Sequence, residues 1–235
     1  MRALLLRLEA PLMAFGREAI DQNGPTRDHP DASLLTGLLA NALGWRREDS
    51  ARHQRLQDRL RFAVRIEREG EELRDFQTAR LEKSDMGWTT RGAPEGRAGG
   101  ARSYVGPHLR FRFYRADAAL TVALTLQPED EAPTLDACAA ALAEPARPLF
   151  IGRKPCLPSG PLALRLVEAS GLMAALACIP PDSCGPSRHV MAPEDAPETP
   201  AGASIFLTGR RDWVAGVHAG QERRVVVSLP PQVIA

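Results

Sequence analysis

The order of apolar patterns along the chain constrains its fold more than any other feature of the sequence. Alternating apolar residues indicate β-strands, and apolar residues three or four positions apart indicate helices. The patterns predict strand, helix, strand, strand, helix and strand, which is the split βαβ arrangement of a ferredoxin-like (RRM-like) α+β sheet. The segments are strand 2–8, helices 33–44 and 50–60, strands 62–67, 73–81 and 120–126, helix 134–143 and strand 150–151.

Local signals at the ends of these segments support the prediction. Asp31 or Ser33 can cap the first helix, Gly44 can end it, and Thr134 can cap the last helix. The turn at residues 69–71 predicts that strand 73–81 pairs with strand 62–67. We expect strand 62–67 to be half-buried, because its apolar residues alternate. We expect the helices to cover one face of the sheet and to leave the other free, an arrangement that often presents side chains to RNA.

Residues 86–107 contain six glycines, too many for a packed helix or strand, and we expect a hairpin that leaves the body of the domain. Between residues 86 and 116 six arginines accompany a single acid, Glu95, although the net charge of the chain is only +1. Tyr104 and Tyr114 lie in the same stretch. Basic residues interleaved with aromatic ones can bind phosphates and stack on bases. A solvated, arginine-rich loop is the other interpretation.

The composition excludes several classes of protein. With 44% apolar and 25% charged residues the chain is not a disordered one, and it has no apolar run long enough to span a membrane. Its first residues do not match a secretory signal, because Arg7 and Glu9 interrupt a short apolar stretch. The four cysteines form no CxxC pair and fit unpaired thiols in a reducing cytosol. We therefore expect a soluble cytoplasmic protein without a cofactor.

A glycine followed by two cations, Gly152-Arg153-Lys154, comes directly after the last predicted strand. Such a corner can hold a phosphate, since glycine permits a close backbone approach and the cations supply charge. It does not have the spacing of a nucleotide-binding P-loop. Solvated surface charge is the alternative.

The five histidines are not spaced for a metal site, and we expect no metal. His108 lies close to Tyr104 and the basic stretch, and such a pair could serve metal-independent RNA cleavage. A histidine in a basic loop can equally be a phosphate or solvent contact.

Four blocks of sequence together resemble the CasD family, the Cas-five-type subunits of the type I-E CRISPR surveillance complex Cascade. They are LRLEAPLMAFG (6–16), PTRDHPDASLLTGLLANALGW (25–45), RFYRADAALTVAL (112–124) and PARPLFIGRKPCLPSGPL (145–162). The chain departs from the family at Asp31, where a small polar residue is usual.

The resemblance implies a ferredoxin-like domain over residues 1–160, with a protruding thumb at about residues 86–115. A small, mostly β C-terminal domain would cover residues 161–235, of which 179–202 read as an irregular connection. The implied function is non-catalytic: the subunit grips the 5′ handle of the CRISPR RNA (crRNA). It would also join the large subunit to the backbone filament, and meet target DNA only indirectly.

The residues that we expect to contact RNA combine the basic stretch, the glycine corner and the entry to the first helix. They are Arg27, Ser33, Arg102, Tyr104, His108, Arg110, Arg112, Tyr114, Gly152, Arg153 and Lys154. Related subunits of another subtype cleave repeat RNA, so an endoribonuclease using Tyr104 and His108 is the alternative function. A general RNA chaperone is a third interpretation.

Overall fold

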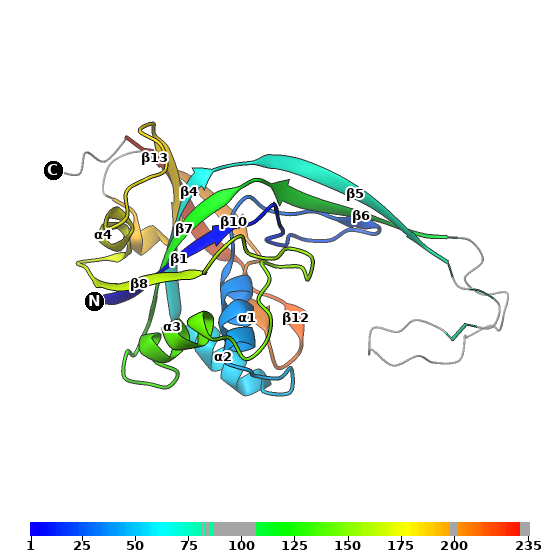
Figure 1. Cartoon of the computed structure of the whole chain (residues 1–235), viewed down its shortest axis with the longest axis horizontal. Helices are drawn as coiled ribbons and strands as arrows, with labels where there is room; N and C mark the ends of the chain where they lie inside the picture. The colour runs from blue at the N-terminus through cyan, green and yellow to red at the C-terminus, as the bar shows by residue number, and fades with distance from the viewer. Residues whose placement is uncertain (81, 83–84, 87–106, 198–201, 231–235) are drawn as a thin grey trace.

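The main element of the computed structural model is an antiparallel sheet of seven strands in the order β10-β13-β9-β4-β7-β1-β8 (Figure 1). The structure describes residues 1–80, 82, 85–86, 107–197 and 202–230. The strands of this sheet are β1 (Arg2–Glu9), β4 (Leu60–Arg68), β7 (Ala119–Leu126), β8 (Ala163–Glu168), β9 (Ser187–Met191), β10 (Ala203–Leu207) and β13 (Glu222–Leu229). The α+β class predicted from the sequence is confirmed.

The central strand β7 lies between β1 and β4, and Val122 pairs with Leu6 on one side and Val64 on the other. Every residue of β7 is buried. In β4 both Ala63 and Val64 are buried, so the expectation of a half-buried strand is wrong. Both faces of the sheet are covered, and this gives the central strands their continuous apolar character.

Three helices cover one face: α1 (Ala32–Ala42), α2 (Ser50–Arg59) and α3 (Leu135–Ala143). A fourth, α4 (Leu172–Ala177), covers the opposite face (Figure 1). Leu172 and Leu176 of α4 pack in one apolar cluster with Leu5 and Ala123 of the sheet. The expected free face is therefore absent over these strands, and an RNA surface must be sought elsewhere.

Two of the predicted helices, α1 and α3, are capped by residues that the sequence indicates. The Asp31 side chain accepts a hydrogen bond from the backbone N–H of Leu34 at 2.9 Å, which caps α1. Thr134 accepts from the N–H of Ala137 at 3.2 Å and caps α3. These caps satisfy backbone donors that the first turn of a helix leaves free.

A second sheet is built on the long ribbon of β5 (Glu71–Ala79) and β6 (His108–Ala116), the β5–β6 ribbon. It extends away from the body of the protein (Figure 1). Two short strands, β2 (Leu12–Met13) and β3 (Asn23–Gly24), pair with β6 where the ribbon meets the body. The predicted pairing of residues 73–81 with strand 62–67 is wrong, because β4 already pairs with β7 and β9. Most of the glycine-rich segment 86–107 lies outside the described residues.

The second half of the chain differs from the prediction in three places. Residues 179–202 were expected to be an irregular connection, but Ser187–Met191 form β9, which pairs with β4 and β13 in the main sheet. Residues 150–151 are not a strand; their loop is held by backbone hydrogen bonds of Ile151 with Ala14 and Cys156, and β8 is the edge strand beside β1. The apolar pattern of residues 213–217 predicts a short strand, but residues 213–216 form the turn between the short strands β11 (Arg211–Asp212) and β12 (Val217–His218). The division near residue 160 stays a prediction, and the main sheet contains strands from both sides of it.

All four cysteines are unpaired, Cys138 and Cys156 being buried and Cys178 and Cys184 exposed. Among the described residues no helix has the length and apolar character needed to cross a membrane.

Two buried histidines make stability depend on pH. Burial lowers the pKa of both His29 and His189 below the ordinary value. The folded protein therefore binds protons less readily than the unfolded chain, and stability is lost as the pH falls below about 6.5. We expect the melting temperature to drop by a few degrees between about pH 7.5 and 5.5, measured by circular dichroism.

The variant His29→Gln/His189→Gln should show a smaller loss over that range. The exposed His218 provides a control, and His218→Gln should lose stability as the wild type does. Equal losses in the double variant and the wild type would contradict this assignment.

Candidate nucleic-acid interface

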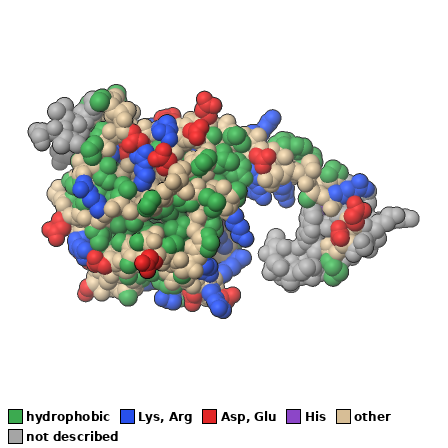
Figure 2. All heavy atoms as spheres, in the orientation of Figure 1, with side chains coloured by type: hydrophobic (Ala, Val, Ile, Leu, Met, Phe, Trp, Pro, Cys, Tyr) green, Lys and Arg blue, Asp and Glu red, His purple; other side chains and the backbone are tan. Residues whose placement is uncertain are grey.

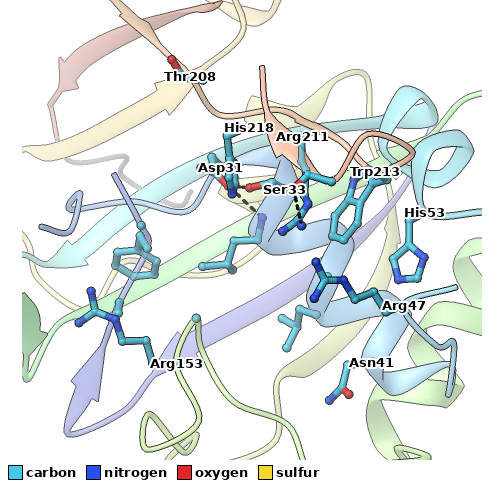
Figure 3. Close-up of a pocket in the computed structure, with 18 of the residues that line it drawn as sticks. Asp31, Ser33, Asn41, Arg47, His53, Arg153, Thr208, Arg211, Trp213 and His218 are labelled. Carbon is cyan, nitrogen blue, oxygen red and sulfur yellow. Dashed lines mark hydrogen bonds between the residues drawn. The ribbon is translucent and has the colours of Figure 1, made fainter. Parts of the chain in front are cut away.

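A groove of about 1100 Å³ runs along one side of α1. Its walls are the segment 14–19, the loop between α1 and α2, the segment 147–153 and the β11–β12 hairpin (Figure 3). This volume lies at the upper limit of small-molecule pockets, which span about 300–1,000 Å³. The groove is therefore large enough to take a segment of a polymer.

The groove is rich in arginine. The acids among its described lining residues are Glu18 and Asp31, and Arg27 forms ion pairs with both, at 2.8 and 3.1 Å. Four other arginines of the groove form no ion pair with a carboxylate in the part of the chain that the structure describes. They are Arg47, Arg147, Arg153 and Arg211. The groove thus offers uncompensated positive charge to a ligand.

Arg153 connects the groove to the β5–β6 ribbon. Its guanidinium donates to the carbonyl oxygens of Phe113 at 2.8 Å and Gly24 at 2.9 Å. It also lies over the ring of Tyr114, 4.8 Å from the centroid. The predicted cationic corner and the base of the ribbon are therefore in direct contact, and Arg153 supports the structure at the place where we expected it to bind RNA.

The neighbours of Arg153 have different roles. Gly152 has φ +89°, and a Cβ on it would lie 1.6 Å from the carbonyl oxygen of Ala14. Glycine is thus required here so that two loops can pack, which is a different reason from the predicted approach to a phosphate. Lys154 is exposed and makes no ion pair with a described residue.

At the start of α1, the charge of Arg27 is neutralised by the carboxylate of Asp31. Asp31 accepts hydrogen bonds from Ser33 Oγ at 2.7 Å, from the Leu34 N–H and from Arg27. Burial raises the pKa of Asp31, and these donors oppose the rise. Because Arg27 and Ser33 are committed to a buried carboxylate, the structure disfavours the prediction that they bind phosphate directly.

The predicted residues of β6 share one face of that strand, since His108, Arg110, Arg112 and Tyr114 alternate along it. Arg110 is exposed and Arg112 half-buried. Tyr114 is only 4% exposed, and Arg153 lies over its ring. The ring of Tyr114 is therefore covered in this conformation, and its expected contact with RNA stays a prediction.

Arg102 and Tyr104 lie outside the described residues. His108 is the half-buried first residue of β6. The alternative nuclease pair thus stays a prediction. No group of three or more metal-ligating side chains is found among the described residues.

Sequence reasoning missed Arg47, Arg147 and Arg211. In a chain with 30 basic residues a single arginine carries no signal. Trp213 was the available signal for this part of the groove, because tryptophan is rare in this chain, which contains only three.

Replacing Gly152 with alanine tests the packing at this corner. The added methyl group would overlap the Ala14 carbonyl, and we expect a loss of at least about 2 kcal/mol in the free energy of unfolding. Gly220→Ala is the matched control, since Gly220 has φ +86° with nothing within 4 Å of its added Cβ. Equal melting temperatures of the two variants would contradict this prediction, because they would mean that the Ala14 loop moves aside without a loss of folding free energy.

Comparison with known proteins agrees with the resemblance. The chain is 32% identical over 173 residues to the "CRISPR system Cascade subunit CasD" of Escherichia coli (strain K12), which covers 74% of this chain and 75% of that protein. A chain of a "CRISPR RNA-guided surveillance complex" superimposes with a TM-score of 0.68 and 26% identity, covering 97% of this chain and 91% of that one. Another, described as "Crystal structure of Cas protein", gives a TM-score of 0.55 and 25% identity over 98% of both.

The sequence pattern of the family described as "CRISPR-associated protein (Cas_Cas5)" matches residues 3–225. This match covers the helices, the groove and the main sheet as far as the middle of β13. The chain therefore belongs to this family of CRISPR-associated proteins.

Proposed function

We propose that this protein is the RNA-binding Cas-five-type subunit of a type I-E Cascade complex and grips the 5′ handle of the crRNA. The family match and the similarity to a Cascade subunit support the complex. The four groove arginines without a carboxylate partner among the described residues are the observation that carries RNA binding. Guanidinium groups bind phosphate oxygens through paired hydrogen bonds, which suits a single strand lying along a groove.

The finer description of the fold belongs to the same proposal. The order β4-β7-β1-β8 supports a ferredoxin-like core, because it is the strand order produced by a βαββαβ chain. The β5–β6 ribbon is the base of the proposed thumb.

The ribbon suits a second role, contact with the backbone subunit. On its other face the rings of Phe76 and Phe111 lie 5.1 Å apart, and Arg74 lies over Phe111. Phe76 is 54% exposed. Exposed aromatic and arginine side chains are enriched in protein interfaces. The large subunit is the other proposed neighbour, and the complex would work in the cytoplasm.

Exposed cations near the corner provide the test of RNA binding. Arg110→Gln/Lys154→Gln removes two charges without touching the contacts of Arg153. We expect weaker binding of labelled single-stranded repeat RNA, and a salt dependence whose slope falls by about 0.7 for each phosphate that the variant no longer neutralises. The measurement is fluorescence anisotropy over a salt series.

Arg110 and Lys154 lie outside the lining of the groove, and Arg46→Gln/Arg223→Gln makes the same charge change at exposed positions of the α1–α2 loop and β13, which also lie outside it. This control should bind nearly as the wild type does. If the two variants bind alike, RNA does not contact Arg110 and Lys154. If the wild type binds no RNA, alone or in the assembled complex, the proposed function itself is wrong.

We also propose that the subunit is not a nuclease. Labelled repeat RNA should stay intact during incubation with the protein in EDTA. Discrete cleavage that His108→Ala abolishes would instead establish the endoribonuclease.

A further inference from the structure

Two arginines from distant parts of the sequence meet at one end of the groove. Arg47 lies in the loop between α1 and α2, and Arg211 belongs to the β11–β12 hairpin. Figure 3 shows their side chains reaching toward one another. Burial lowers the pKa of Arg211, and the charge of Arg47 lowers it further. The two cations therefore repel each other.

The repulsion is not compensated within the described residues. The acids of the groove, Glu18 and Asp31, are engaged by Arg27. The nearby Asp212 carboxylate accepts the backbone N–H groups of Val214 and Ala215, which closes the hairpin turn. An anion between the two guanidinium groups would relieve the repulsion and receive several N–H donors.

The position of Arg211 is fixed before any ligand binds. Gln57, which is fully buried in α2, bonds the backbone of Arg211 twice, at 3.0 Å to its N–H and 2.8 Å to its carbonyl. The guanidinium donates to the Gly216 carbonyl at 2.9 Å and lies over the ring of Trp213. Trp213 in turn stacks on His53, with ring centroids 4.7 Å apart. Such preorganisation lowers the entropy cost of binding.

We infer that Arg47 and Arg211 together bind one backbone phosphate of single-stranded RNA. This rests on the proposed function, because Arg153 lies at the other end of the same groove (Figure 3). A strand leaving the corner at Arg153 can follow the groove past the start of α1 to this pair. This pair gives the RNA a second point of attachment. Together with the corner at Arg153 it defines the path of the RNA across the body of the subunit.

The test compares Arg47→Gln/Arg211→Gln with the control Arg46→Gln/Arg223→Gln. With labelled single-stranded repeat RNA we expect the affinity of the first variant to fall by roughly tenfold at low salt. Its salt slope should be smaller by about 0.7, the value for one phosphate of a single strand. The control should stay within about twofold of the wild type, since its charges lie outside the groove.

A DNA strand of the same sequence distinguishes the phosphate from other parts of the nucleotide. Both strands carry the phosphate, so the variant should lose the same factor with each. A loss confined to RNA would place the 2′-hydroxyl at these arginines and overturn the assignment. Arg47→Gln alone, in an exposed loop, gives the answer if the double variant does not fold.

The outcomes separate this inference from the proposed function. If Arg110→Gln/Lys154→Gln weakens RNA binding and Arg47→Gln/Arg211→Gln does not, the second phosphate site is wrong and the function stands. Normal RNA affinity with failure to enter the complex would identify an acidic protein surface as the ligand of this pair. If the wild-type protein binds no RNA, both proposals fail.

Discussion

The side chain of Arg153 holds together the parts of the molecule on which the candidate interface depends. It bonds the carbonyl oxygens of Gly24 in β3 and Phe113 in β6, and it covers the ring of Tyr114. Gly152 lets the same loop pack against Ala14. Because one guanidinium joins the groove to the β5–β6 ribbon, a strand of RNA could pass from one to the other across a rigid corner.

The distribution of charge is the reason for choosing the groove as the candidate RNA site. Elsewhere many arginines are paired, as Arg65 is with Glu67 at 2.7 Å and Arg2 with Asp136 at 2.8 Å. Among the described arginines of the groove, Arg27 pairs with Glu18 and Asp31 and Arg17 pairs with Glu18, whereas the other four have no carboxylate partner in the described part of the chain. Figure 2 shows basic side chains along the concave side between the body and the ribbon. The near-neutral net charge hides this local excess, since the acids lie elsewhere.

Features fixed by neighbouring residues could be predicted from the sequence, and those fixed by distant ones could not. Asp31 and Thr134 cap their helices through bonds three residues away, so the helix starts were predictable. The partner of β5 was missed because a turn at Gly70 fits a local hairpin equally well, whereas β4 is already paired on both edges. Arg153 was predicted because it follows Gly152 in the cationic corner and lies in a block of sequence that resembles the family. Arg47 and Arg211 become neighbours only when the β11–β12 hairpin docks on Gln54 and Gln57 of α2.

The central claim is that RNA lies in the groove beside α1 and not on the sheet face covered by α4. Ultraviolet crosslinking of crRNA in the assembled complex, followed by mass spectrometry of the crosslinked peptides, tests it most directly. We predict crosslinks on the peptides that contain Phe150 and Trp213, both of which line the groove. Crosslinks confined to α4 or β8, with these peptides unmodified, would contradict the account.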